Sequence, residues 1–198
     1  MNSTRLGFTT VPGMCHPLRP RNNSRALDVL IAATRRVVAA ERSARRVSRI
    51  LAEVLAPFLQ VDDLLTPEQH EPDATNYRQH VLHVEPDGSF SIAALVWLPG
   101  QATPIHDHVS WCVVGVYKGT ERETRYQMRG SGHDAYLVVT GTNLNERGTV
   151  DALVPPGDIH SVANASDAVA VSLHVYGVDL CTLGCCIRRN YQLPVRVT

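Results

Sequence analysis

The chain has 198 residues, and its 19 Lys and Arg residues balance 19 Asp and Glu residues, which gives a formal net charge of zero. This length suits one domain with a full hydrophobic core better than two. A balanced charge creates no overall field that would attract nucleic acid or an anionic membrane, so we expect neither as a partner. No apolar run approaches the roughly 20 residues of a membrane-spanning helix. Residues 1–25 lack the apolar core of a signal peptide, so the sequence predicts a cytoplasmic protein.

The five cysteines are unevenly placed, which does not indicate a disulfide framework and favours free thiols in a reducing compartment. Cys181, Cys185 and Cys186 have an alternative interpretation as a soft metal cluster. Adjacent cysteines seldom both reach one ion, and no second pair completes a tetrahedral site, so we favour a packed or surface loop. The sequence leaves the oligomeric state open and is compatible with a monomer.

The N-terminal third of the chain divides into two segments. Residues 1–23 are rich in proline and polar residues, which predicts an irregular leader. Residues 24–76 carry two apolar stripes at helical spacing, with Ser24 as a candidate N-cap and Pro57 near the end of the second stripe. Thr66 and the following proline indicate one more short helix. We therefore expect a helical N-terminal cap over residues 24–76.

Residues 77–198 have a β pattern throughout. Two alternating runs, at residues 77–85 and 89–98, are joined by Pro86-Asp87-Gly88 and predict a hairpin. Further strands are expected at residues 121–128, 135–140, 152–154 and 168–176. Short spacings between strands favour a sandwich or barrel over βαβ units. The predicted fold is mainly β, a small jelly-roll-type barrel with a helical cap, forming one structural domain overall.

Two histidines one residue apart stand inside the apolar run of residues 100–119. On a strand, positions i and i+2 share a face, so His106 and His108 can hold one metal ion together. If the strand is unbroken, the same parity brings Ser110 and Cys112 to that face. The frame resembles the first cupin motif, in which a metal-binding glutamate normally stands at the position of Cys112.

A third histidine follows in a second frame. The sequence PPGDIH at residues 155–160, with Asn164 four residues later and Gly148 before it, is similar to the second cupin motif. The joint occurrence of both frames predicts that His106, His108 and His160 bind one metal. The predicted barrel is accordingly a cupin double-stranded β-barrel.

The strand at residues 168–176 carries Ser172, His174 and Tyr176 on one face and apolar residues on the other. A polar row inside a barrel has to be hydrogen-bonded internally, which favours a Ser-His-Tyr chain. The alternative is a strand with its polar face in water. A nucleophilic-serine triad is less attractive, because all three residues lie on one strand and no oxyanion-binding turn is visible.

These motifs together resemble the cysteine dioxygenase family of cupins. The resemblance implies an Fe(II) ion on the three histidines and, as substrates, a small thiol and O2, with a sulfinic acid as the product. It also implies that Tyr176 lies beside the iron, oriented by His174 and, through it, by Ser172. Some family members link the equivalents of Cys112 and Tyr176 by a thioether bond.

The resemblance also bears on the substrate. Gln79 stands where mammalian-type members carry an arginine for the substrate carboxylate, and a glutamine there resembles bacterial 3-mercaptopropionate dioxygenases. In those enzymes the arginine follows the Ser-His-Tyr strand, which makes Arg188 and Arg189 candidates, with Arg189 preferred. We therefore expect 3-mercaptopropionate as the favoured substrate, with cysteine next.

Two alternatives belong to other functional classes. One is a non-catalytic cupin that binds a metal or a thiol as a sensor or accessory domain. The other is a cupin dioxygenase or isomerase acting on a carbon substrate, which requires a carboxylate ligand where Cys112 stands.

Overall fold

The computed structural model describes residues 24–196, so the predicted leader at residues 1–23 lies outside the described residues. Two helices open the described chain, α1 (Arg25–Ala40) and α2 (Ala44–Leu55). Ser24 caps α1, because its hydroxyl oxygen accepts a hydrogen bond from the Leu27 backbone N–H at 3.1 Å. Two short 3-10 helices follow, η1 (Ala56–Gln60) and η2 (Pro67–His70).

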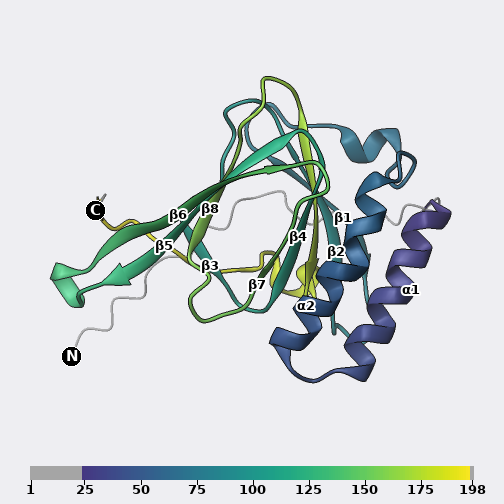
Figure 1. Cartoon of the computed structure of the whole chain (residues 1–198), viewed down its shortest axis with the longest axis horizontal. Helices are drawn as coiled ribbons and strands as arrows, with labels where there is room; N and C mark the ends of the chain where they lie inside the picture. The colour runs from purple at the N-terminus through teal and green to yellow at the C-terminus, as the bar shows by residue number, and fades with distance from the viewer. Residues whose placement is uncertain (1–23, 197–198) are drawn as a thin grey trace.

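Apart from the short helices η3 (Gly132–Asp134) and α3 (Leu180–Leu183), the regular structure in the rest of the chain forms two sheets that face each other as the halves of a barrel (Figure 1). The first sheet has the order β1-β2-β9-β4-β7, and its strands are β1 (Arg78–Val84), β2 (Ser91–Trp97), β9 (Ala170–Tyr176), β4 (Cys112–Lys118) and β7 (Val150–Leu153). The second has the order β10-β3-β8-β5-β6-β11, and its strands are β10 (Ile187–Asn190), β3 (His106–His108), β8 (His160–Asn164), β5 (Thr120–Arg129), β6 (Tyr136–Glu146) and β11 (Val195–Arg196). The predicted class, a mainly β cupin barrel with N-terminal helices, is confirmed.

The two helices lie against the outer face of the first sheet (Figure 1). Buried leucines from α1 and α2 share one apolar cluster with the outward-facing β9 residues Val171, Leu173 and Val175. Fully burying one such side chain contributes about 1.5–3 kcal/mol. Because the helices cover the odd-numbered residues of β9, its even-numbered residues face the barrel interior.

The run at residues 100–119 is not one continuous strand, so the condition for a shared parity is not met. His106 and His108 lie on β3 in the second sheet, whereas Cys112 begins β4 in the first sheet. The chain passes from one sheet to the other at residues 109–111, where the Ser110 hydroxyl donates to the Trp111 carbonyl. Side-chain parity is therefore not carried from β3 into β4.

β6 is longer than predicted and continues to Glu146. Its second half is largely polar on both sides, so it lacks the alternation that marks a half-buried strand. Pairing with β5 along its whole length holds it in place, and the two strands form the hairpin that projects from the barrel in Figure 1.

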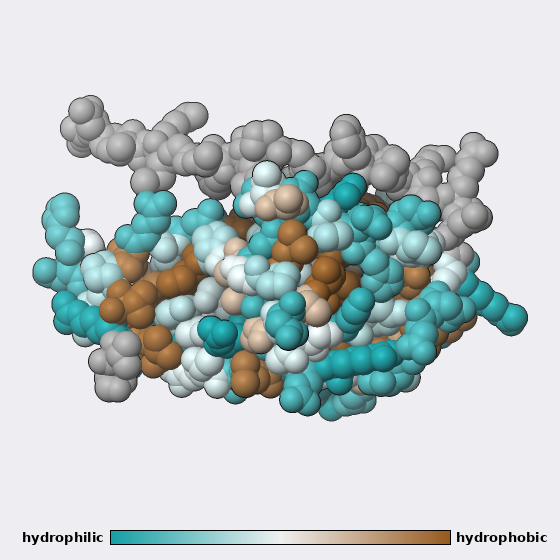
Figure 2. All heavy atoms as spheres, turned by 90° about the horizontal axis from the view of Figure 1, so that it is seen from above, coloured by the Kyte–Doolittle hydropathy of each residue, from teal (hydrophilic) through white to brown (hydrophobic). Residues whose placement is uncertain are grey.

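Within residues 24–196, no helix has both the length and the apolar character needed to cross a membrane. The face seen in Figure 2 mixes hydrophilic and hydrophobic residues.

Candidate metal centre

Three histidines converge inside the barrel. His106 and His108 lie on β3, and His160 begins β8 as the direct register partner of His106. The possible ligand atoms of the three side chains all lie within 4.8 Å of one another. Each residue is at most 4% exposed, so water competes little for these nitrogens.

The outer ring nitrogen of each histidine has its own hydrogen-bond acceptor. Nδ1 of His106 lies 2.9 Å from the Pro104 carbonyl, and Nδ1 of His108 lies 2.9 Å from Asp158 Oδ2. Nδ1 of His160 lies 2.9 Å from Glu123 Oε1. When Nδ1 donates its proton to such an acceptor, Nε2 keeps a free lone pair, which is the tautomer a metal needs.

The structure leaves that second nitrogen available. His160 Nε2 is buried and has no hydrogen-bond partner among the described residues, which is costly unless a ligand satisfies it. Burial, with the neighbouring histidines, lowers the pKa of His106 well below its usual value. Burial also lowers the pKa of His160 to about 3. Both imidazoles are therefore neutral near pH 7, as metal ligation requires.

Two carboxylates orient these ligands and were missed by the sequence analysis. Asp158 Oδ2 accepts from both the backbone N–H and the ring of His108. Glu123 accepts from His160 and from Arg125 Nε. Asp158 lies within the second histidine motif, two residues before His160, but was not assigned a role there. Glu123 and Glu121 stand at alternate positions of a predicted strand and so share one face of it. Two acidic residues on the inner face of a barrel were the sequence feature that could have identified Glu123.

In residues 24–196, the group with metal-ligand spacing contains these three histidines and no carboxylate. Three neutral imidazoles leave the charge of a divalent ion uncompensated and leave coordination positions open to substrates. The donor set therefore fits a metal that binds an anionic substrate. It gives no support to the alternative of a carbon-acting cupin with a carboxylate ligand.

The Ser-His-Tyr row lies on β9 in the middle of the first sheet, and all three side chains are at most 5% exposed. The Tyr176 hydroxyl is 2.9 Å from His174 Nδ1, and Ser172 Oγ is 2.9 Å from His174 Nε2. The ring centres of Tyr176 and His108 are 6.4 Å apart. The row thus forms one hydrogen-bonded chain in the interior that ends beside the histidine cluster.

Two buried thiols flank Tyr176. Cys112 is fully buried, with its Sγ 3.9 Å from His174 Nδ1. Cys186 lies in the predicted loop and is buried in the same apolar cluster as Tyr176. Burial raises the pKa of Cys112 well above its usual value, so this thiol stays protonated. Cys181 is exposed, and the three C-terminal cysteines form no group with metal-ligand spacing.

The three candidate substrate residues lie in different places. Gln79 is the register partner of Leu95, whose side chain belongs to the interior cluster, so Gln79 lies on the inner face of β1. Its Nε2 is buried without a partner among the described residues. Arg188 and Arg189 both donate to Asp107 Oδ2, at 2.5 and 3.4 Å. Asp107 alternates with the two histidines of β3, so these contacts lie on the opposite face of that strand.

A three-histidine cluster enclosed by a double-stranded β-barrel defines a metal centre of the cupin class. Residues 70–185 match the model of the family described as cysteine dioxygenase type I. This match covers more than half of the chain, and the chain belongs to that family, whose members are non-haem iron oxidoreductases.

Solved structures with a similar fold include a protein from Thermus thermophilus, which is 20% identical, covers 56% of this chain and 91% of its own, and gives a TM-score of 0.42. A double-stranded β-helix protein from Klebsiella pneumoniae is 17% identical over 57% of this chain and 85% of its own, with a TM-score of 0.41. The Cnp3 cupin domain of Schizosaccharomyces pombe is 15% identical over 55% of this chain and 63% of its own, with a TM-score of 0.40.

Proposed function

We propose that this protein is an iron(II)-dependent thiol dioxygenase, which adds both atoms of O2 to the sulfur of a small carboxylate-bearing thiol. The product is a sulfinic acid, so R–SH and O2 together become R–SO2H. The observation that carries the proposal is the buried group of His106, His108 and His160, with no carboxylate ligand, in a chain of the cysteine dioxygenase family.

The chemistry follows from the charge of the site. When bound, ferrous iron supplies Lewis acidity and one-electron redox capacity. Three neutral histidines leave the site cationic, which favours deprotonation of a thiol that enters it. Tyr176 places a buried hydroxyl beside the cluster, held by His174, where it can donate to or accept from a polar atom of the substrates.

For the substrate we favour 3-mercaptopropionate over cysteine. Gln79 supports this choice, because it lies on the inner face of β1 and has an unsatisfied amide nitrogen. Arg189 remains the preferred carboxylate anchor, because it is the more exposed arginine and its contact with Asp107 is the longer one, and this role requires its side chain to leave Asp107 and turn toward the histidines. A guanidinium can bind a carboxylate bidentately, so release from Asp107 would suit it for this role.

The test is oxygen consumption by iron(II)-loaded protein with 3-mercaptopropionate, cysteine and cysteamine, with the product identified by mass. We expect uptake with 3-mercaptopropionate and a product heavier by two oxygen atoms. Cysteamine, which lacks the carboxylate, is expected to react least. Preferred turnover of cysteamine would contradict the substrate assignment while leaving the thiol dioxygenase in place.

The second candidate is a non-catalytic cupin that senses a metal or a thiol, in which case iron-loaded protein would consume no oxygen with any thiol. The oriented tyrosine favours the enzyme, because binding alone does not require a hydroxyl held by a buried hydrogen-bonded chain. A cytoplasmic location is part of the proposal, supported by four free cysteines among the described residues.

A further inference from the structure

The hydrogen-bonded chain behind Tyr176 does not end at Ser172. Ser172 Oγ also accepts a hydrogen bond from the Trp97 indole N–H at 3.2 Å. The carboxyl group of Glu121, on β5 in the opposite sheet, lies near Ser172 and Trp97, and the Ser172 hydroxyl and the Trp97 indole both lower the pKa of this carboxyl group. The interior therefore holds a hydrogen-bonded chain of Ser172, His174 and Tyr176, with the Glu121 carboxyl group near its Ser172 end.

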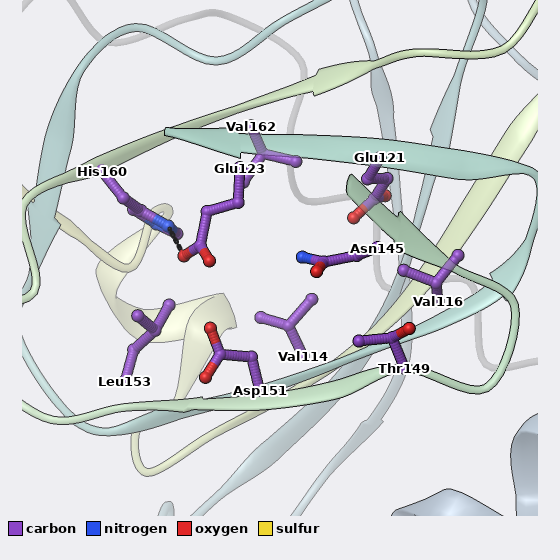
Figure 3. Close-up of a pocket in the computed structure, with 10 residues that line it drawn as sticks. All are labelled: Val114, Val116, Glu121, Glu123, Asn145, Thr149, Asp151, Leu153, His160 and Val162. Carbon is purple, nitrogen blue, oxygen red and sulfur yellow. Dashed lines mark hydrogen bonds and ion pairs between the residues drawn. The ribbon is translucent and has the colours of Figure 1, made fainter. Parts of the chain in front are cut away.

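Glu121 is an unusual member of this chain, because it is only 1% exposed and forms no ion pair among those the described residues make. Its Oε1 is buried and has no hydrogen-bond partner among residues 24–196. Figure 3 shows its carboxyl group pointing from β5 into an interior pocket that it shares with His160 and Glu123. Burial raises the pKa of Glu121 to about 7, so both of its protonation states are accessible near neutral pH.

The proton on Glu121 determines how the chain is ordered. Burial lowers the pKa of His174 to about 3, so its ring is neutral and has one donor and one acceptor nitrogen. If Glu121 is protonated, it donates to Ser172 Oγ, and Ser172 must donate to His174 Nε2. His174 Nδ1–H then donates to the Tyr176 oxygen, which leaves the Tyr176 proton free to point toward the histidine cluster.

Ionised Glu121 reverses every bond in this chain. Its carboxylate accepts the Ser172 proton, so Ser172 Oγ becomes the acceptor for His174 Nε2–H. His174 Nδ1 then lacks a proton and accepts one from Tyr176. Tyr176 now presents an oxygen lone pair, and no proton, toward the cluster. Trp97 donates to Ser172 in both states, because indole N–H is only a donor.

We propose that Glu121 is a positioning residue that sets the direction of the Ser172–His174–Tyr176 chain and thereby decides whether Tyr176 offers a proton or a lone pair to the metal centre. The consequence for turnover rests on the proposed function, whereas the change in the His174 tautomer does not. A bound thiolate and oxygen are acceptors, so the proton-donating state, with Glu121 protonated, is expected to be the active one.

Several other charged or titratable groups line the space around Glu121. Glu123 lies on the same strand and raises the pKa of Glu121 further, and Asp151 on β7 and His160 on β8 line the same space. His174 on β9 lies behind Ser172, to which it is hydrogen-bonded. Arg125 forms ion pairs with both Glu123 and Asp151 and so compensates their negative charge. Val114 and Val116 on β4 and Asn145 on β6 add no charge.

The test compares wild type with Glu121→Gln, which keeps the shape and hydrogen-bonding capacity but cannot ionise. Nitrogen NMR of zinc-loaded protein reports the tautomer of His174, whose signals are assigned by their loss in His174→Asn. As pH rises, we expect the wild-type His174 tautomer to change from Nδ1–H to Nε2–H. The midpoint should lie near pH 7, because the pKa of Glu121 is about 7. Glu121→Gln is expected to lose this transition, whereas Glu146→Gln, the same change at an exposed site, should keep it.

The activity profile supplies the second measurement. In the iron-loaded wild type, kcat is expected to decline as pH rises through the same midpoint. In Glu121→Gln, kcat should show no such decline near pH 7. A pH-independent His174 tautomer in wild type would overturn the proposal, even if Glu121→Gln failed to fold. A transition unchanged in Glu121→Gln would overturn it as well. Absence of turnover with an intact tautomer transition would count against the proposed function and leave the role of Glu121 standing.

Discussion

Cys112 and Tyr176 are register partners in the ladder between β4 and β9, and both side chains are buried. Partners on adjacent antiparallel strands share a face, with Cβ atoms about 4.5–5.5 Å apart. The Cys112 thiol therefore lies beside the Tyr176 ring on the side of the sheet that faces the histidines. Cys186 approaches the same tyrosine from the loop before β10.

This pairing leads to a prediction about covalent structure. We expect a thioether bond between Cys112 and the ring of Tyr176 after turnover with iron and oxygen, with loss of two hydrogen atoms. Mass spectrometry of proteolytic peptides would detect the linked pair, and both Cys112→Ala and Tyr176→Phe should abolish it. Cys186→Ala is the control and should retain the bond. A link between Cys186 and Tyr176 would show that the loop cysteine is the reactive partner.

A second prediction concerns Glu123, whose carboxylate accepts a hydrogen bond from the metal-site residue His160. Removal of such an outer partner typically weakens metal binding by about 10–100-fold. We expect Glu123→Ala to lower iron(II) affinity within that range, and His160→Ala to abolish binding. Titration of metal-free protein with iron under anaerobic conditions measures both effects. Glu146→Ala, an exposed change on the neighbouring strand, should bind iron as wild type does, and equal affinity in Glu123→Ala would contradict the orienting role.

The sequence predicted the fold class because its two histidine motifs and its alternating strands are local patterns. His106, His108 and His160 could be identified because their spacing resembles the two cupin motifs, and the structure brings them together. The turn at residues 109–111 could not be foreseen, because passage between two sheets depends on long-range pairing of β3 with β8 and of β4 with β9.

The same limit applies to the residues that support the site. Glu121 and Glu123 are 51 and 37 residues away in sequence from the residues they contact, Ser172 and His160 (172 − 121 and 160 − 123). Acidic residues at alternate positions of a strand usually indicate its solvent-facing side, and here the barrel encloses that side. The contacts of Arg188 and Arg189 with Asp107 likewise depend on the register of β10 against β3, which no local pattern encodes.

A third prediction concerns the stability of the metal-free protein in acid. The folded-state pKa values of His160 and His174 are about 3, below the usual 6.5, because burial disfavours the charged rings. Between these values the unfolded chain binds more protons than the folded chain, so the free energy of unfolding falls as pH decreases. The slope is at most about 1.4 kcal/mol per pH unit for each histidine. Glu121 opposes this trend between its usual 4.5 and about 7, because its raised pKa favours folding as pH falls.

The pKa of His106 is lowered as well, so three histidines act against one glutamate, and the net change on acidification is a loss of stability. Urea unfolding of metal-free protein at a series of pH values measures it. His174→Asn should reduce the slope, and His133→Asn, at an exposed position, should leave it unchanged. Stability that stayed constant from about pH 6.5 to 4 would contradict the neutral, buried state assigned to these rings.

The last prediction separates Arg188 from Arg189. Asp107 is 1% exposed and accepts hydrogen bonds from both arginines and from the Tyr191 hydroxyl. Arg188 forms the shorter contact and is the less exposed arginine. Arg188→Ala should therefore lower the free energy of unfolding by about 1 kcal/mol, because a buried carboxylate loses a charged donor.

Arg189→Ala should instead leave stability nearly unchanged, since its contact with Asp107 is long and its side chain is 56% exposed. As the preferred anchor for the substrate carboxylate, Arg189 should show its effect in KM for 3-mercaptopropionate, with a rise of about tenfold and little change in kcat. Urea unfolding and steady-state oxygen uptake, measured on both variants, distinguish the two roles. A raised KM in Arg188→Ala with an unaffected Arg189→Ala would exchange the assignments. An unchanged KM in both would mean that neither arginine holds the carboxylate, and Gln79, whose amide nitrogen is unsatisfied on the inner face of β1, would become the first residue to substitute.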